Sequence, residues 1–129
     1  MSEIQRRVHF PDSLYQAVTA YAESIMKGDM DAGSKLVAAG AMVSHRETFA
    51  SAAEKQPWND YDLIARARLG RQYIVKVRFH GSSGALTLQC RWRESAGSGW
   101  QIAEIADIGL RSPWLKPEPG EESMRKANG

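Results

Sequence analysis

The first clear hydrophobic pattern along the chain is a stripe of apolar residues that recur every three or four positions. Within residues 13–27 this spacing predicts an amphipathic helix with one buried face, formed by Leu14, Ala17, Val18, Tyr21, Ala22 and Ile25. Ser13 and Gln16 match a capping box at its start, with Asp12 as an alternative cap. Gly28 is a natural stop, because glycine tolerates the left-handed conformation that follows many helices.

The segment that follows is harder to interpret. Asp29 is expected to cap a second, short helix that ends near Gly40. Met42–His45 could form a short strand, and Thr48–Lys55 a short alanine-rich helix that must end before Pro57. The first third of the chain is therefore predicted to be mainly helical.

From Tyr61 onward the hydrophobic period changes to two, which is typical of strands with two different faces. Short loops rich in glycine or serine separate the runs, which indicates antiparallel hairpins. Four strands are predicted: Tyr61–Leu69, Tyr73–His80, Ala85–Glu94 and Trp100–Ile108. Together with the helices, they predict an α+β fold in which helices pack on a curved antiparallel sheet of four to five strands.

Strand pairing can be predicted because residues directly opposite each other share a face of the sheet. A turn at Ser82-Ser83 pairs apolar residues throughout the second hairpin: Phe79 with Leu86, Val77 with Leu88, Val75 with Cys90, and Tyr73 with Trp92. This agreement along the whole hairpin favours that register.

The first hairpin has two alternatives. A two-residue turn at Gly70-Arg71 places Arg66 and Arg68 on the apolar face. A three-residue loop, residues 70–72, places Leu63, Ala65, Ala67 and Leu69 there instead. Burying an unpaired arginine costs several kcal/mol, so the three-residue loop is predicted.

The last strand is left with two registers, which differ in the side chains that point into the core. Either Trp100 and Ile102 point inward together with Glu104, or Ala103 and Ile105 point inward and Glu104 is solvated. The position of this carboxylate decides whether it can take part in chemistry.

Composition places the chain in the ordinary globular class. Hydrophobic residues make up 43% of its 129 residues and charged residues 25%. A single domain is expected over residues 1–115, with a disordered polar tail over residues 116–129. With 17 basic against 15 acidic residues the net charge is only +2, which does not favour a nucleic-acid partner.

Cysteine usage and the terminal sequences indicate a compartment. Cys90 is the one cysteine, so no intramolecular disulfide can form, and its apolar setting predicts a buried thiol. Neither a secretory signal nor a membrane-spanning run is recognised, so a cytoplasmic protein without a membrane partner is expected.

Two local patterns, taken in their order along the chain, carry a family resemblance. The first is Met26-Lys-Gly-Asp-Met-Asp-Ala32 between the two helices, and the second is Gly99-Trp-Gln-Ile-Ala-Glu-Ile105 in the last strand. With the helix-then-meander order, residues 10–110 resemble the nuclear transport factor 2-like (cystatin-like) superfamily, which includes ketosteroid isomerase- and polyketide cyclase-type proteins. The resemblance implies a bent sheet that leaves a conical pocket and dimers formed through the outer sheet face. Members have many activities, so the fold alone selects none of them.

Isomerase-type members of that superfamily use an aspartate base, a tyrosine and a protonated carboxylic acid. The stretch 41–45 has no aspartate, and His45 could replace it, with Tyr15 or Tyr21 as hydrogen-bond donor. An inward Glu104 would be a second candidate acid or base, because desolvation raises the pKa of a carboxyl group. The alternatives are a structural histidine and a solvated glutamate.

The remaining candidate sites are binding surfaces. Four aromatic residues could line an apolar ligand pocket or simply form core: Tyr21, Phe79, Trp92 and Trp100. A basic outer sheet face is expected to hold Arg66, Arg68, Lys76, Arg78, Arg91 and Arg93, and a homodimer interface or solvated face suits it better than RNA.

Metal and cofactor chemistry have no support, since His9, His45, His80 and Cys90 show no ligand spacing and no phosphate loop precedes a helix. The leading hypothesis is a domain that binds a small apolar molecule, with isomerase, dehydratase or cyclase chemistry by proton transfer. The alternatives are a non-enzymatic dimerisation or adaptor module and, less favoured, an anion- or RNA-binding sheet face. An open cone would favour the first hypothesis and a filled one the module.

Overall fold

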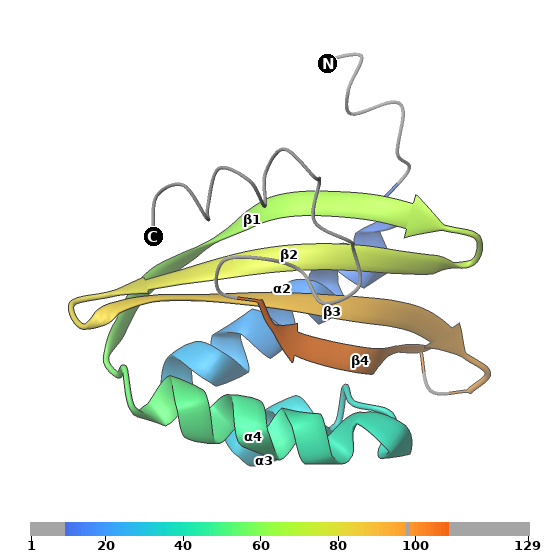
Figure 1. The fold of residues 1–129 in the computed structure, drawn as a ribbon. Helices are drawn as coiled ribbons and strands as arrows, with labels where there is room; N and C mark the ends of the chain where they lie inside the picture. Colours follow the sequence, from blue (N-terminus) through green and yellow to red (C-terminus); the bar gives the residue numbers. More distant parts are fainter. Residues whose placement is uncertain (1–9, 98, 109–129) are drawn as a thin grey trace, which may run out of the picture.

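The computed structural model describes residues 10–97 and 99–108, in which helices pack on one antiparallel sheet (Figure 1). The sheet order is β1-β2-β3-β4, which confirms the predicted α+β meander. No helix in these ranges is long and apolar enough to cross a membrane. The predicted tail, residues 116–129, lies outside them. The elements are α2 (Asp12–Lys27), α3 (Met30–Ser34), η1 (Ala39–Ala41), α4 (Met42–Ala53), β1 (Trp58–Leu69), β2 (Gln72–Gly81), β3 (Gly84–Ser95) and β4 (Gly99–Asp107).

Helix α2 forms where the apolar stripe predicted it and ends as expected at Gly28, which has a left-handed φ of 69°. The capping box is wrong, because Ser13 lies inside the helix and its Oγ accepts a hydrogen bond from Trp100 Nε1 at 2.9 Å. Asp29 caps α3 as predicted, its Oδ1 accepting from the Ala32 N–H at 3.1 Å. Helix α3 ends at Ser34, before the predicted Gly40.

Helix α4 replaces the short strand predicted for Met42–His45. Its buried residues are His45, Thr48, Phe49 and Ala52, which recur at helical spacing. The first of them is His45, and because histidine is polar, the buried face of this helix was not recognised in the sequence. Helix α4 packs beside β4, and α2 crosses one face of the sheet (Figure 1).

The second hairpin has the predicted register at every pair from Tyr73↔Trp92 to Phe79↔Leu86. Its inward residues are buried and form most of the core with α2: Tyr73, Val75, Val77, Phe79, Leu86, Leu88, Cys90 and Trp92.

The first hairpin has the two-residue Gly70-Arg71 turn, so the predicted three-residue loop is wrong. Arg66 lies opposite Val75 and Arg68 opposite Tyr73, on the side of the apolar core. The desolvation argument does not apply, because every residue from 64 to 69 is exposed on this edge strand. A bulge between Leu63 and Ala65 shifts the register, so Leu63 returns to the apolar side but lies opposite Val77 instead of the predicted Phe79.

The last strand combines both predicted registers. A bulge between Arg91 and Trp92 in the ladder makes Ala103 an extra residue, so Ile102 pairs with Trp92 and Ile105 pairs with Cys90. Both isoleucines are buried, at 0% and 8% exposure. Glu104 lies opposite Arg91 and therefore points to the outer face.

Candidate functional site

The interior between helix and sheet is filled by side chains. A cavity of only about 10 Å³ remains there, lined in part by Tyr21, Phe79 and Trp92. Holding one water takes about 10–15 Å³, and ligand pockets occupy roughly 300–1,000 Å³. An open apolar cone, which we expected, is therefore not seen among the described residues.

The four aromatic residues considered as pocket lining or as core are all buried. Their exposures are 3% for Tyr21, 1% for Phe79, 1% for Trp92 and 9% for Trp100. The rings of Tyr21 and Trp92 meet edge-on with centroids 6.4 Å apart, which is the geometry of packed aromatic pairs. The set forms core, and Trp100 alone also reaches the open cleft described below.

His45 and Tyr21 come together, as one of the predicted acid–base arrangements requires. The Tyr21 hydroxyl lies 2.8 Å from His45 Nδ1, and Nε2 lies 3.0 Å from the carbonyl oxygen of Met30. A carbonyl oxygen only accepts, so we assign the proton to Nε2, and Nδ1 accepts from the Tyr21 hydroxyl. Both ring nitrogens of His45 are thus satisfied.

Burial dominates the electrostatics of this pair. Desolvation, with a smaller contribution from Arg46, lowers the pKa of His45 despite the hydrogen bond to Met30. Desolvation and, secondarily, Cys90 raise the pKa of Tyr21. Both groups are therefore neutral at pH 7. Without a cavity beside them, they form a satisfied structural pair in this conformation.

The other predicted proton-transfer residues are not brought to this pair. Tyr15 is 50% exposed, and its ring meets Phe10 edge-on. Glu104 accepts from Arg91 Nε at 2.9 Å and forms an ion pair with the same guanidinium on the outer face. The inward position that would make Glu104 an acid or base is therefore not met.

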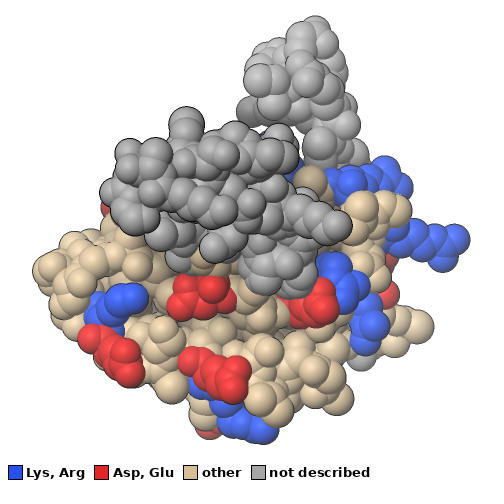
Figure 2. All heavy atoms as spheres, in the orientation of Figure 1, with Lys and Arg blue, Asp and Glu red and all other residues tan. Residues whose placement is uncertain are grey.

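An open cleft lies at one end of the sheet and is lined by residues of both the β1–β2 and the β3–β4 turns. Its volume is about 890 Å³, and Arg68, Arg71 and Arg93 line it together with Glu94. Basic side chains gather at this end of the molecule, on the right of Figure 2. None of the three arginines forms an ion pair with a carboxylate in residues 10–97 and 99–108, where the pairs are Arg91–Glu104 and His80–Asp62.

The two turns build the cleft from glycine-dependent geometry. Gly70 has a φ of 64°, which permits the tight turn and places Arg71 at its tip. The floor is formed by Tyr73 and Trp100, whose ring centroids are 5.7 Å apart. The hydrogen bond from Trp100 Nε1 to Ser13 Oγ fixes this floor to α2. The cleft was not predicted from the sequence, although arginines beside two glycine-containing turns were a usable signal.

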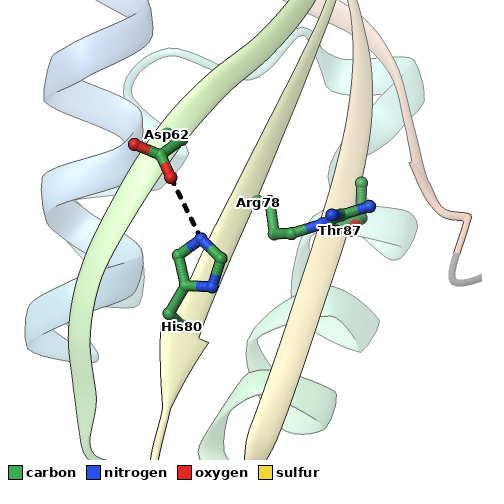
Figure 3. A network of polar contacts seen from close by, with 4 residues as sticks. All are labelled: Asp62, Arg78, His80 and Thr87. Atoms are coloured by element: carbon green, nitrogen blue, oxygen red, sulfur yellow. Dashed lines mark hydrogen bonds and ion pairs between the residues drawn. The ribbon is translucent and has the colours of Figure 1, made fainter.

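The outer sheet face is less basic than predicted. Arg66 and Arg68 belong to the other side, which leaves Lys76, Arg78, Arg91 and Arg93. Figure 3 shows its polar contacts, in which His80 Nε2 lies 3.1 Å from Asp62 and Arg78 Nε donates to Thr87 Oγ1 at 3.0 Å. The face thus carries both signs of charge. Across residues 10–97 and 99–108, no cluster of histidine, cysteine or acidic residues could hold a metal ion.

Comparison with known proteins identifies the fold. No family model matches the sequence, and no curated protein does. A crystal structure of an NTF2-like protein of unknown function from Shewanella baltica OS155 superposes with a TM-score of 0.58 at 12% identity, covering 81% of this chain and 94% of that one. One from Silicibacter pomeroyi DSS-3, also NTF2-like and of unknown function, gives 0.55 at 12% identity, covering 81% and 96%. The chain therefore has the NTF2-like fold, as its sequence patterns predicted.

Proposed function

We propose that this chain is an NTF2-like binding domain that holds a small anionic molecule in the cleft between its β1–β2 and β3–β4 turns. The observation that carries the proposal is the presence of Arg68, Arg71 and Arg93 around a cleft of about 890 Å³. Arginine binds carboxylate and phosphate groups through two parallel N–H bonds, so several arginines in one cleft favour an anion.

The lining also indicates the kind of anion. Tyr73 and Trp100 are 5% and 9% exposed, so they offer little ring surface for stacking. Glu94 adds a carboxylate that can accept from a hydroxyl or ammonium group of the ligand. A compact, polar carboxylate or phosphate compound fits this cleft better than the apolar molecule expected from an open cone.

Calorimetric titration with a panel of small carboxylates and phosphates tests the proposal. A hydrogen bond to a charged group contributes about 1.5–3 kcal/mol, so Arg71→Ala and Arg93→Ala should each weaken binding roughly tenfold or more. Arg78→Ala is the matched control, because it removes the same charge from the outer face. Equal weakening by all three variants would indicate unspecific charge attraction and contradict the proposal.

A homodimer formed through the outer sheet face is the second candidate. The filled cone supports an association module, and the mixed charges of this face suit a polar, hydrated interface. Sedimentation velocity at increasing concentration should then show a dimer that Arg78→Glu weakens. A monomer at every concentration would exclude it.

A further inference from the structure

The two edge strands of the sheet differ in what covers them. Along β4, the Ala38 N–H donates to the Ile102 carbonyl at 2.9 Å and the Ile102 N–H donates to Leu36 at 2.8 Å. In the described ranges β1 pairs with β2 alone, and its six residues 64–69 are all exposed. β1 is the outermost strand on its side of the sheet in Figure 1.

We propose that this bare segment of β1, residues 64–69, binds an extended peptide strand that carries acidic side chains at alternate positions. An edge strand presents backbone N–H and carbonyl groups to which such a strand can pair. Arg66 and Arg68 are two residues apart and share one side of the sheet. Carboxylates on alternate residues of an added strand would lie opposite both of them.

The arginines are partly positioned for this role. The Arg66 guanidinium carbon lies 5.2 Å from the centroid of the Phe10 ring, and Arg68 Nε donates to the Gly70 carbonyl at 2.9 Å. These contacts use few of the five N–H donors of each guanidinium, so the others can reach a carboxylate. Ala65, Ala67 and Leu69 face the opposite side, which favours small or apolar residues between the acidic ones.

Charge also argues against a second copy of this chain paired symmetrically about residues 66–68. In an antiparallel pair related by a two-fold axis perpendicular to the sheet, opposite residues must face the same side. A pair centred on Ala67 therefore sets Arg66 against Arg68, and one centred on either arginine sets that residue against itself. Like charges directly opposite destabilise a strand pair. An acidic strand removes this repulsion.

The experiment uses the full chain and an end-blocked, fluorescein-labelled heptapeptide in which glutamate alternates with valine. Two further versions carry N-methyl groups on one or the other alternate set of residues, and a fourth replaces glutamate by lysine. Fluorescence anisotropy should show that the glutamate peptide binds. One of the two N-methylated versions should bind at least tenfold more weakly, because only one alternate set of N–H groups faces β1. Hydrogen exchange should slow within residues 64–69 when the peptide binds.

Protein variants separate this edge from the cleft and from simple charge attraction. The double variant Arg66→Glu/Arg68→Glu should lose the glutamate peptide and gain the lysine peptide. Because Arg68 also lines the cleft, two cleft variants are needed to separate the sites. Arg71→Ala and Arg93→Ala, which alter the cleft but not residues 64–69 of β1, should leave peptide affinity within twofold. The peptide-binding result does not depend on the cleft, so it would stand even if small anions failed to bind there.

Several results would overturn the inference. Equal binding of both N-methylated peptides would show that charge alone attracts the ligand. Loss of peptide binding in Arg71→Ala would place the peptide in the cleft. Absence of binding would show that the arginines only protect the edge. Self-association that the variant Arg66→Glu/Arg68→Glu abolishes would show that a second copy occupies it.

Discussion

The hydroxyl of Tyr21 and Nδ1 of His45 lie 2.8 Å apart, and this hydrogen bond joins α2 to α4 inside the core. The His45 ring also packs edge-on against Phe49 at a centroid distance of 4.8 Å. The bond from Nε2 to the Met30 carbonyl connects α3 to the same group. One histidine therefore fixes the relative positions of three helices, and its contacts should matter for stability.

Tyr21→Phe should destabilise the protein by about 1–3 kcal/mol, because it leaves Nδ1 of His45 buried without a donor. Urea unfolding at pH 8 measures the change. Tyr61→Phe is the matched control, since its hydroxyl donates to the exposed Glu23 at 3.3 Å and water can replace that contact. Equal stability of the two variants would mean that the buried hydrogen bond contributes little.

The stability of the protein should fall as the pH drops below about 6.5. Burial lowers the pKa of His45 in the folded state, whereas the unfolded chain has the ordinary value of about 6.5. Above that value His45 is neutral in both states and its contribution to stability is complete. Below it the unfolded state binds more protons, so stability decreases by up to about 1.4 kcal/mol per pH unit until the folded pKa is reached.

Unfolding by urea at pH 8, 7, 6 and 5 checks this dependence. His45→Gln serves as the comparison, because it keeps a polar side chain but has no titrating group. The variant is expected to be less stable at pH 8 and to show a shallower slope between pH 7 and 5. Parallel curves for the two proteins would assign the slope to other groups.

Gly33→Ala should be destabilising by about 1–3 kcal/mol, because its site is already filled. A methyl group there would lie 2.7 Å from Ser24 Oγ, 3.0 Å from His45 Cε1 and 3.2 Å from Phe49 Cζ. Gly40→Ala is the control, since a methyl group at Gly40 would meet nothing within 4 Å. Thermal unfolding should separate the two, and similar melting temperatures would contradict the packing described around His45.

The thiol of Cys90 should be unreactive in the folded protein. It is 5% exposed, and burial raises its pKa to about 12, so almost no thiolate is present at pH 8. Reaction with a thiol-specific chromogenic disulfide should be slow in buffer and complete within seconds to minutes in denaturant. Fast labelling of the folded protein would show that the sheet opens at β3.

Parts of the fold could be predicted from sequence because their residue patterns had one consistent solution. The second hairpin is the clearest case, since apolar residues pair with apolar residues along its whole length. The first hairpin failed for a physical reason. The prediction assigned the free-energy cost of burial to Arg66 and Arg68, as if this half of β1 were covered. On an edge strand both side chains stay in water.

The candidate site was less predictable than the fold. The sequence left Tyr15 and Tyr21 as alternative partners of His45. Which of them meets the histidine, and whether a cavity lies beside the pair, depends on how the whole core packs. The cleft depends on how two turns approach each other in space, which hydrophobic periodicity does not encode. Pairing rules likewise assume regular strands, so they could not predict the bulge in which Ala103 is the extra residue.

The bulge at Ala103 leads to a final prediction about β4. Because it turns both isoleucines inward, Ile102→Ala and Ile105→Ala should each cost about 2–5 kcal/mol, as expected for large-to-small changes in a core. Glu104→Ala should cost less than about 1 kcal/mol, because it removes a partly exposed ion pair. Urea unfolding of the three variants measures the order. With a regular strand, one of the two isoleucines would face outward, and its alanine variant would unfold like the native protein.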